Sequence, residues 1–305
     1  MSLDCVGFGA LNVDRLYNVE RIARLGEETF VTDSKEYLGG SAANTVIGLA
    51  RLGHKVGYVG KLGNDEAAKS HIHSFLHEGV DTHGIVQDKR SRSGLVLGFI
   101  DQRGERTLYV DPGVNDTLDF EEVNQEYAAS AKFVHMTSFV GDRPFRAQLK
   151  LLEARPSIQV SFDPGEIYAR KGLQVMRPFL KRSRVVFPNE GELRILTGEG
   201  PEQGAKTLLR EGAGIVAVKL GERGCFVTDG KDSSSVPVFK VGVVDTTGAG
   251  DAFCAGFLHG LIAGKDIYEC AKLGNLVASK KLTKPGAREG LPSLEDIEPE
   301  PQPTN

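Results

Sequence analysis

Short apolar runs alternate with helical patterns along most of the chain. From residue 120 onward the runs predict buried strands, and segments with a helical period follow several of them. The strand-like runs are KFVHM, IQVSFD, RVVFPN, GIVAVKL and GCFVTD, with helices expected near 144–154, from 190 and over about 249–263. Strands that alternate with helices favour an α/β fold with a mainly parallel sheet flanked by helices.

The first third of the chain carries a second pattern. Residues 28–38 alternate with period two, and residues 94–100 and 105–110 predict a hairpin around a short polar turn. These segments predict a small antiparallel β unit within the α/β pattern. Between them, residues 39–53 predict a helix that Ser41 caps and that Gly53 ends.

Composition excludes several classes of protein. Lys and Arg number 37 against 41 Asp and Glu, and the resulting net charge of −4 does not suit a nucleic-acid partner. No apolar run approaches the roughly 18 residues that a membrane span needs, and no signal peptide is visible, so we expect a cytoplasmic protein with no membrane partner. The spacing of the four cysteines fits neither a disulfide framework nor a zinc site, which predicts buried thiols.

Glycine is abundant, with 37 copies among 305 residues, and one glycine-rich segment points to phosphate. Residues 245–253 read DTTGAGDAF, follow the strand-like VGVV at 241–244, and precede an apolar helix. A glycine turn at a helix N-terminus offers free N–H groups and the positive end of the helix dipole to an anion. The carboxylate of Asp251 would repel phosphate there, so its presence needs a reason, and the role of general base for the hydroxyl that attacks the phosphorus supplies one. The alternative is that Asp251 caps the helix and Gly248 and Gly250 only turn the chain.

The full string resembles the signature of the ribokinase-like (PfkB) family of carbohydrate and nucleoside kinases, and further matches extend over about residues 4–292. The resemblance implies a three-layer α/β core with a mainly parallel sheet and a small antiparallel β lid. It also implies ATP and Mg²⁺ as cofactors, a sugar or nucleoside as substrate, and a homodimer formed through the lid. The core would comprise residues 1–11, 39–92 and 112–292, the lid residues 12–38 and 93–111, and a flexible tail residues 293–305.

The same resemblance assigns roles to individual residues. Asp251 would be the base, and the N–H groups of Gly248, Ala249 and Gly250 would stabilise the transferred phosphoryl group. Substrate would meet an Asn-x-Asp pair, a di-glycine hinge and an asparagine, which are Asn12, Asp14, Gly39, Gly40 and Asn44. The N-x-x-E motif would organise magnesium through water, and further residues would line the nucleotide; these are Asn189, Glu192, Lys219, Gly221, Gly224, Asn275 and Gly286. Asp245 and Thr247 would help bind a monovalent cation such as K⁺.

Each of these residues also has an ordinary structural interpretation. Asn12 and Asp14 could form a turn, Asn189 and Glu192 could cap a helix, and Lys219 and Asn275 could be exposed polar positions. His71, His73 and His77 could hold a metal ion, although a solvated helix face explains them as well. A nucleotide- or sugar-binding module without catalysis is the alternative from another functional class.

Two departures from the family pattern concern the substrate. Ribokinases proper carry a lysine after the di-glycine and a glutamate near the strand end that corresponds to Ser138–Phe139, whereas this chain has Ser41 and no such glutamate. The GGSAAN form resembles nucleoside-kinase members of the family. If this chain acts on a nucleoside, Phe139 would stack on the base; the alternative places Phe139 in the core or at its rim. Ribokinase proper or another hexose or acid-sugar kinase is the alternative function, with Arg103 and Arg106 available to an anionic group.

Overall fold

The computed structural model describes residues 2–297, and within that range the larger sheet has nine strands in the order β13-β12-β11-β10-β9-β8-β1-β4-β5. The strands are β1 (Leu3–Phe8), β4 (Val56–Leu62), β5 (Asp81–Gln87), β8 (Ala131–Thr137), β9 (Gln159–Asp163), β10 (Ser183–Val186), β11 (Val216–Lys219), β12 (Cys225–Thr228) and β13 (Ser233–Val236). All pairs from β5 to β11 are parallel, and β12 runs antiparallel to both of its neighbours. The predicted, mainly parallel sheet is therefore confirmed.

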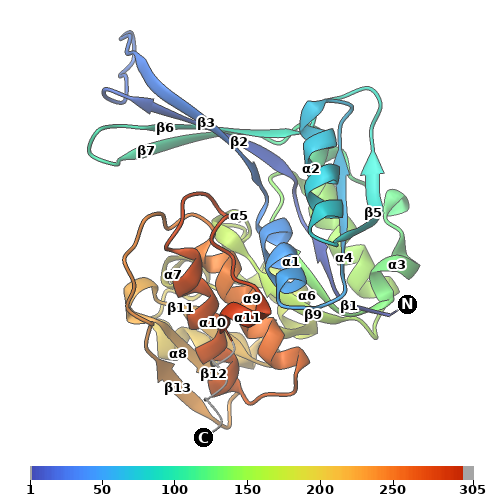
Figure 1. Ribbon diagram of the computed structural model, residues 1–305. Coiled ribbons are helices and arrows are strands. Elements are labelled where there is room, and N and C mark those ends of the chain that lie inside the picture. The colour runs from blue at the N-terminus through green and yellow to red at the C-terminus, as the bar shows by residue number, and fades with distance from the viewer. Residues whose placement is uncertain (1, 298–305) are drawn as a thin grey trace, which may run out of the picture.

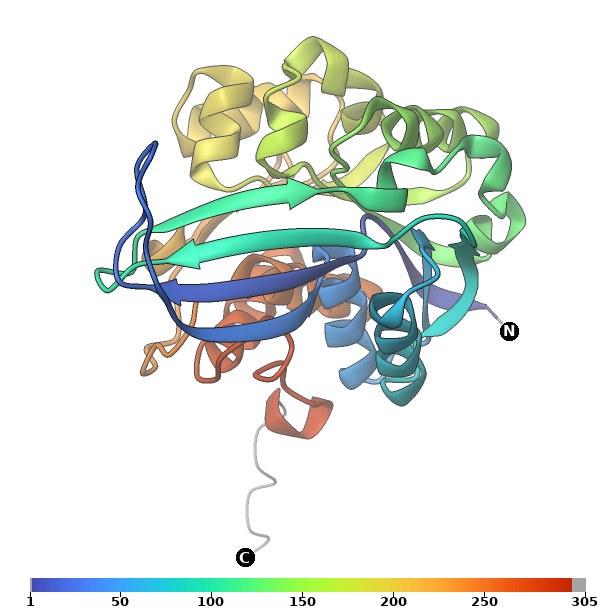
Figure 2. The ribbon, with the colours of Figure 1, turned by 90° about the horizontal axis from the view of Figure 1, so that it is seen from above.

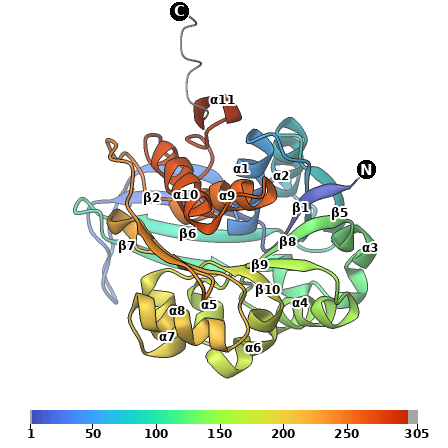
Figure 3. The same ribbon diagram turned by 90° about the horizontal axis from the view of Figure 1, so that it is seen from below.

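Helices cover both faces of this sheet, which gives three layers (Figure 3). One face packs against α1 (Ser41–Arg51), α2 (Glu66–His77), α9 (Ala249–Ile262) and α10 (Ile267–Lys281). The other packs against α3 (Gln125–Ala129), α4 (Asp142–Ala154), α5 (Gly165–Ala169), α6 (Leu173–Arg182), α7 (Glu190–Thr197) and α8 (Pro201–Arg210). Each face has its own apolar cluster, because successive strand residues point to opposite sides of the sheet.

A second sheet lies across one end of the core (Figures 1 and 2). It contains β2 (Asn12–Val19), β3 (Val31–Gly39), β6 (Gly94–Ile100) and β7 (Arg106–Asp111), in the order β3-β2-β6-β7. It consists of two antiparallel hairpins whose inner strands, β2 and β6, run parallel to each other. The predicted β lid and the predicted hairpin are both present.

Short 3₁₀ helices and a C-terminal helix complete the described elements. They are η1 (Gly113–Thr117), η2 (Phe120–Glu122), η3 (Gly221–Arg223) and α11 (Leu294–Ile297). The flexible tail expected from residue 293 is thus wrong for 294–297, and its remainder, 298–305, lies outside the described residues. In residues 2–297, no helix has the length and apolar character that crossing a bilayer requires.

Two further local expectations are wrong, while two others hold. Residues 241–244 form no strand, and Val243 and Val244 are 60% and 62% exposed. Ser41 is the first residue of α1 rather than its cap, which is Gly40. Gly53 follows the end of α1 with a φ of 85°, as predicted for a terminating glycine. All four cysteines are buried and free, as expected.

Candidate active site

The N-terminus of α9 lies where the lid faces the core. Gly248 is its N-cap, with a φ of 76°, and a Cβ there would lie 2.9 Å from the Ala287 backbone. Only glycine accepts both the left-handed conformation and this close approach. Ala249 N–H donates to Thr246 O at 3.2 Å, and the next N–H groups begin the helix without intrahelical acceptors. The turn therefore has free donors at the position where the sequence predicts an anion site, although one of its N–H groups is already engaged.

Asp251 lies in the first turn of α9, and the neighbouring helix α1 holds its side chain. Asn44 Nδ2 donates to Asp251 Oδ2 at 2.8 Å. Burial raises the pKa of Asp251 to about 7, and the negative charge of Asp163 adds to this. The bonds from Asn44 and Ser41 and the charge of Lys219 act in the opposite direction. A carboxyl group with a pKa near neutrality is suited to accept a proton during catalysis.

Two cavities meet at this helix N-terminus. One, of about 570 Å³, lies under the lid and is lined by Asn12, Asp14 and Asp251 among others. The second, of about 870 Å³, is more apolar and is lined by Val243, Phe253 and Asn275 among others. Thr246, Ala249 and Gly250 border both. A group bound at the turn is therefore accessible from both cavities.

The cavity under the lid has a polar wall and an apolar wall. Its polar side chains include four carboxylates and four amides, which are Asp14, Asp116, Asp245, Asp251, Asn12, Asn44, Asn115 and Asn189. Most of its large apolar side chains belong to the lid, namely Leu16, Val96, Leu108 and Val110, while Val140 and Ile167 belong to the core. Carboxylates and amides are suited to bind hydroxyl groups. Burial raises the pKa of Asp14 to about 6, against the opposing charge of Arg288.

Phe139 does not lie in this cavity. Its side chain is 1% exposed and packs edge-on against Phe8, with the ring centroids 6.0 Å apart. Its neighbours Ser138 and Val140 line the cavity in its place. The hypothesis that Phe139 stacks on a base is therefore wrong for this structure, and its alternative, a core residue, holds.

Of the two lid arginines that could meet an anionic group, Arg106 lines the cavity under the lid, whereas Arg103 is paired with Asp101 and Glu105.

The carboxyl ends of three parallel strands supply a charged cluster beside α9. Lys219, at the end of β11, donates to Asp163 Oδ2 at the end of β9, at 2.5 Å. Burial opposes the charge of Lys219, yet the neighbouring carboxylate of Asp163 raises its pKa. Asn189, after β10, caps α7 in a reciprocal box with Glu192. Burial, with the charge of Asp163, raises the pKa of Glu192 to about 7.

The remaining residues that we expected beside the nucleotide are divided between the two cavities. Lys219, Gly221, Gly224 and Asn275 line the apolar cavity. Asn275 Nδ2 donates to the carbonyl oxygens of Val236 and Pro237, at 2.9 and 3.0 Å. These bonds hold the end of β13 against α10 beside the cavity. Gly286 lies at the other cavity, and its N–H donates to Asp245 Oδ2 at 2.8 Å.

The loop around Asp245 does not fit a monovalent-cation site. The carboxylate of Asp245 accepts from Thr247 N–H at 2.9 Å and from Gly286 N–H. Lys281, which is fully buried, donates from Nζ to the Asp245 carbonyl oxygen at 2.8 Å. A lysine already brings positive charge to this loop, and we assign no K⁺ site to Asp245 and Thr247.

Comparison with known proteins agrees with this geometry. A family model described as pfkB family carbohydrate kinase matches residues 2–294. The chain belongs to the PfkB family. A protein of Archaeoglobus fulgidus described as an uncharacterized sugar kinase is 43% identical over 253 residues, covering 82% of this chain and 100% of the relative. Ribokinase of Staphylococcus aureus is 27% identical, covering 97% of this chain and 99% of the relative.

The solved structures give the same result. Ribokinase from Thermotoga maritima superposes with a TM-score of 0.86 at 25% identity, covering 97% of this chain and 98% of that one. Membership of the PfkB family confirms the expected ribokinase-like fold and makes the chain a phosphotransferase that acts on alcohol groups. A binding module without catalysis is therefore disfavoured.

Several residues of this PfkB site were not found from the sequence. Asp163 pairs with Lys219, and its position directly after an apolar strand was a usable signal. Asn115 donates to Asn12 Oδ1 at 3.0 Å and to Leu11 O, and Arg288 contacts Asn44; neither residue belongs to a motif that marked it.

His71 lies within 3.0 Å of Asn12 O, and burial lowers its pKa to about 3. In the described residues, no cluster of three or more His, Cys, Asp or Glu side chains could hold a metal, so the histidine hypothesis finds no support.

Proposed function

We propose that this PfkB kinase transfers the γ-phosphate of ATP to a primary hydroxyl of a sugar or a nucleoside. The meeting of two cavities at the N-terminus of α9, with Asp251 facing only the polar one, carries the proposal. ATP would occupy the apolar cavity, with its phosphates toward Lys219 and the glycine turn. The acceptor would occupy the polar cavity under the lid. The phosphoryl group would then cross at Ala249 and Gly250, where the cavities share a border.

In this mechanism Asp251 accepts the proton of the attacking hydroxyl, whose oxygen forms a bond to phosphorus while the bond to the ADP oxygen breaks. The N–H groups at the start of α9 donate to the oxygens of the phosphoryl group, on which negative charge is spread. The Asn44 amide holds the carboxylate of Asp251 in place at 2.8 Å.

Magnesium fits this charge arrangement. Asp163, Glu192 and Asp251 bring three carboxyl groups to the site, against the single ammonium of Lys219. Mg²⁺ keeps much of its water and often binds through only one or two protein groups together with substrate phosphates. We propose that Asn189 and Glu192 hold it through water. When bound, the ion supplies positive charge to the phosphates.

The lid would exclude water from the phosphoryl group, which would otherwise be hydrolysed. Its pocket-facing side chains Leu108 and Val110 are 45% and 47% exposed, and a bound acceptor would cover them. Gly39 and Gly40 connect the lid to α1, and Gly40 has a φ of 111°, which suits the predicted hinge.

The outer face of the lid carries an aromatic row of Tyr17, Phe99 and Tyr109, and we propose that a second copy of the chain covers it. A kinase that consumes ATP would act in the cytoplasm.

The acceptor class follows from the two walls of the cavity. Hydroxyl groups of a sugar ring would meet Asn12, Asp14 and Asp116, while the lid's apolar side chains would cover the ring or an attached base. Ser41, at the position where ribokinases proper carry lysine, and Ser138, in the Ser138–Phe139 segment that corresponds roughly to their glutamate, both line the cavity. This exchange favours an acceptor other than free ribose.

A panel assay tests the proposal. Purified protein with MgATP is offered pentoses, hexoses, acid sugars and nucleosides, and ADP is measured together with the phosphorylated product. We expect ADP production that depends on one acceptor class and forms product in equal amount. Nucleotide binding without acceptor-dependent ADP production across the panel would contradict the proposal.

A further inference from the structure

Arg288 is a buried arginine close to the catalytic turn that none of the steps above uses. It follows the loop at residues 283–287 and is 8% exposed. Its Nε donates to Asn44 Oδ1 at 2.9 Å, and its Nη2 donates to Gly39 O at 3.2 Å. A longer contact of 3.3 Å joins its Nη1 to Ser74 Oγ. One side chain thus connects the hinge, helix α1 and helix α2.

The chemistry of the two side chains fixes the orientation of the Asn44 amide. A carboxamide has an acceptor end and a donor end, and could present either to Asp251. Arginine has only donors, so the end of the amide that meets Arg288 must be the oxygen. The nitrogen is then directed at the carboxylate of Asp251, which can only accept when it is ionised.

We infer that Arg288 is a positioning residue for the catalytic base: it holds Asn44 with its amide nitrogen toward Asp251 and ties that arrangement to the hinge carbonyl of Gly39. This inference rests on the proposed function, since it requires Asp251 to be the base. Without Arg288, the Asn44 amide could turn and present its oxygen to the carboxylate. The base would lose a donor and gain a repulsive contact.

The charged and titratable groups around both partners limit what such a change can do. Five such groups face Arg288: Asp14 on β2, Tyr58 on β4, His71 on α2, Glu78 at the end of α2, and Glu289 in the same loop as Arg288. Five face Asp251: Asp163 on β9, Lys219 on β11, Cys254 on α9, Tyr58 on β4, and Lys281 on α10. Arg288 has no direct bond to Asp251 among these contacts. Its effect on the base must therefore pass mainly through Asn44.

The test combines Arg288→Met, Asn44→Ala and the double variant, using the acceptor found in the panel. We expect Arg288→Met to lower kcat by about 10- to 100-fold. It should also move the acid limb of the kcat/KM profile to higher pH by about half a unit to one unit, because the base has lost its donor. In the Asn44→Ala background the same substitution should change kcat by less than about threefold, since the connecting amide is gone.

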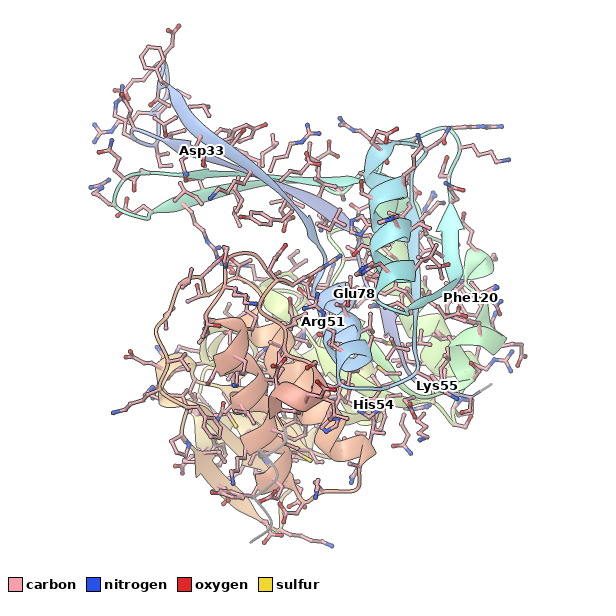
Figure 4. The ribbon with its side chains drawn as sticks, viewed as in Figure 1. Asp33, Arg51, His54, Lys55, Glu78 and Phe120 are labelled. Carbon is pink, nitrogen blue, oxygen red and sulfur yellow. The ribbon has the colours of Figure 1, made fainter. Side chains whose placement is uncertain are left out.

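Arg51→Met is the matched control. Arg51 lies beside Glu78 and donates to its carboxylate (Figure 4). It also donates to the carbonyl oxygens of Arg288 and Leu291, so its loss loosens the same loop without removing a contact of Asn44. It should lower the melting temperature and leave the pH profile in place. If Arg288→Met does not fold, Arg288→Gln carries the same cycle, because glutamine has both a donor end and an acceptor end and no longer determines which end of the Asn44 amide it meets.

The outcomes separate this inference from the proposed function. An unmoved acid limb in Arg288→Met, or additive effects in the double variant, would overturn the positioning role even where Asp251→Asn is inactive. Full activity of Asp251→Asn would instead refute the proposed base itself.

Discussion

Asp251 has opposite effects on catalysis and on stability. Its proposed task requires the ionised carboxylate, yet burial raises its pKa to about 7, so the folded protein binds a proton there more readily than the unfolded chain does. The donor from Asn44 and the charge of Lys219 limit that shift. The site therefore keeps a base that is partly protonated at neutral pH, which suits proton transfer.

The first prediction concerns the pH dependence of activity. Because the base must be ionised and its pKa is about 7, kcat/KM should rise with pH across roughly pH 6 to 8 and then level off. Steady-state assays at saturating Mg²⁺ measure this profile. A kcat/KM that stays constant from pH 5.5 to 8 would show that no group with this pKa is needed in the free enzyme.

The second prediction concerns stability. The pKa of Asp251 is raised in the folded state, so the cost of ionising it is absent below about pH 4 and fully present above about pH 7. Asp251→Asn should therefore melt about 2 °C or more above the wild type at pH 8, with a smaller difference at pH 5.5. Thermal unfolding at the two pH values measures this. A difference that grows toward low pH would have the wrong sign.

At the scale of the element, the start of α9 depends on a glycine that no other residue replaces. Gly248→Ala would place a Cβ against the Ala287 backbone in a left-handed conformation, and should lower activity by tenfold or more as the turn shifts. Gly264, just past the other end of α9, has a φ of 73° with open space around it, and is the matched control. Gly264→Ala should cost about 1 kcal/mol of stability through the same backbone strain and leave kcat unchanged. Equal losses of kcat in both variants would contradict the account.

Elements with a strong local pattern were predictable from the sequence. The apolar runs at β8 to β12 form strands and the helical pattern before residue 263 forms α9, and the glycine turn before α9 is the segment for which the sequence predicts a phosphate site. Val241 and Val243 misled the prediction because valines that line a cavity have the same composition as valines in a strand. Phe139 misled it because sequence does not tell whether an aromatic at a strand end points to the core or to a cleft. Asn115 and Arg288 were missed because their partners, Asn12 and Asn44, lie more than a hundred residues away.

At the scale of the whole molecule, the lid and the core form one site from separate segments. Asn12 and Asp14 come from β2, Asp163 and Lys219 from the core strands, and Asp251 from α9. In Figure 1 the lid extends well past the core, with Asp33 near its far end in Figure 4. In the β2–β3 hairpin only the part close to the hinge borders the cavity, since the lining residues of β2 end at Leu16. In the other hairpin, β7 lines the cavity as far as Arg106, beside the turn.

The lid gives a prediction of its own. Acceptor binding should cover Leu108 and Val110 and draw the lid toward the core, so amide hydrogens of β2, β6 and β7 should exchange more slowly with acceptor than without it. Hydrogen exchange read by mass spectrometry measures this, with β12 and β13 at the far edge of the core sheet as an internal control. Equal protection of the lid strands in both states would show that the acceptor does not close the lid.

The most direct test of the account is the rate of phosphoryl transfer by Asp251→Asn, measured beside its affinity for ATP. Asparagine keeps the shape of the side chain and removes the base, so kcat with the best acceptor should fall by about 10²- to 10⁴-fold. ATP should still bind at least as tightly as to the wild type, because Asp251 faces only the acceptor cavity and the variant removes a negative charge near the phosphates. A kcat within about threefold of the wild type would contradict the central claim that Asp251 is the base.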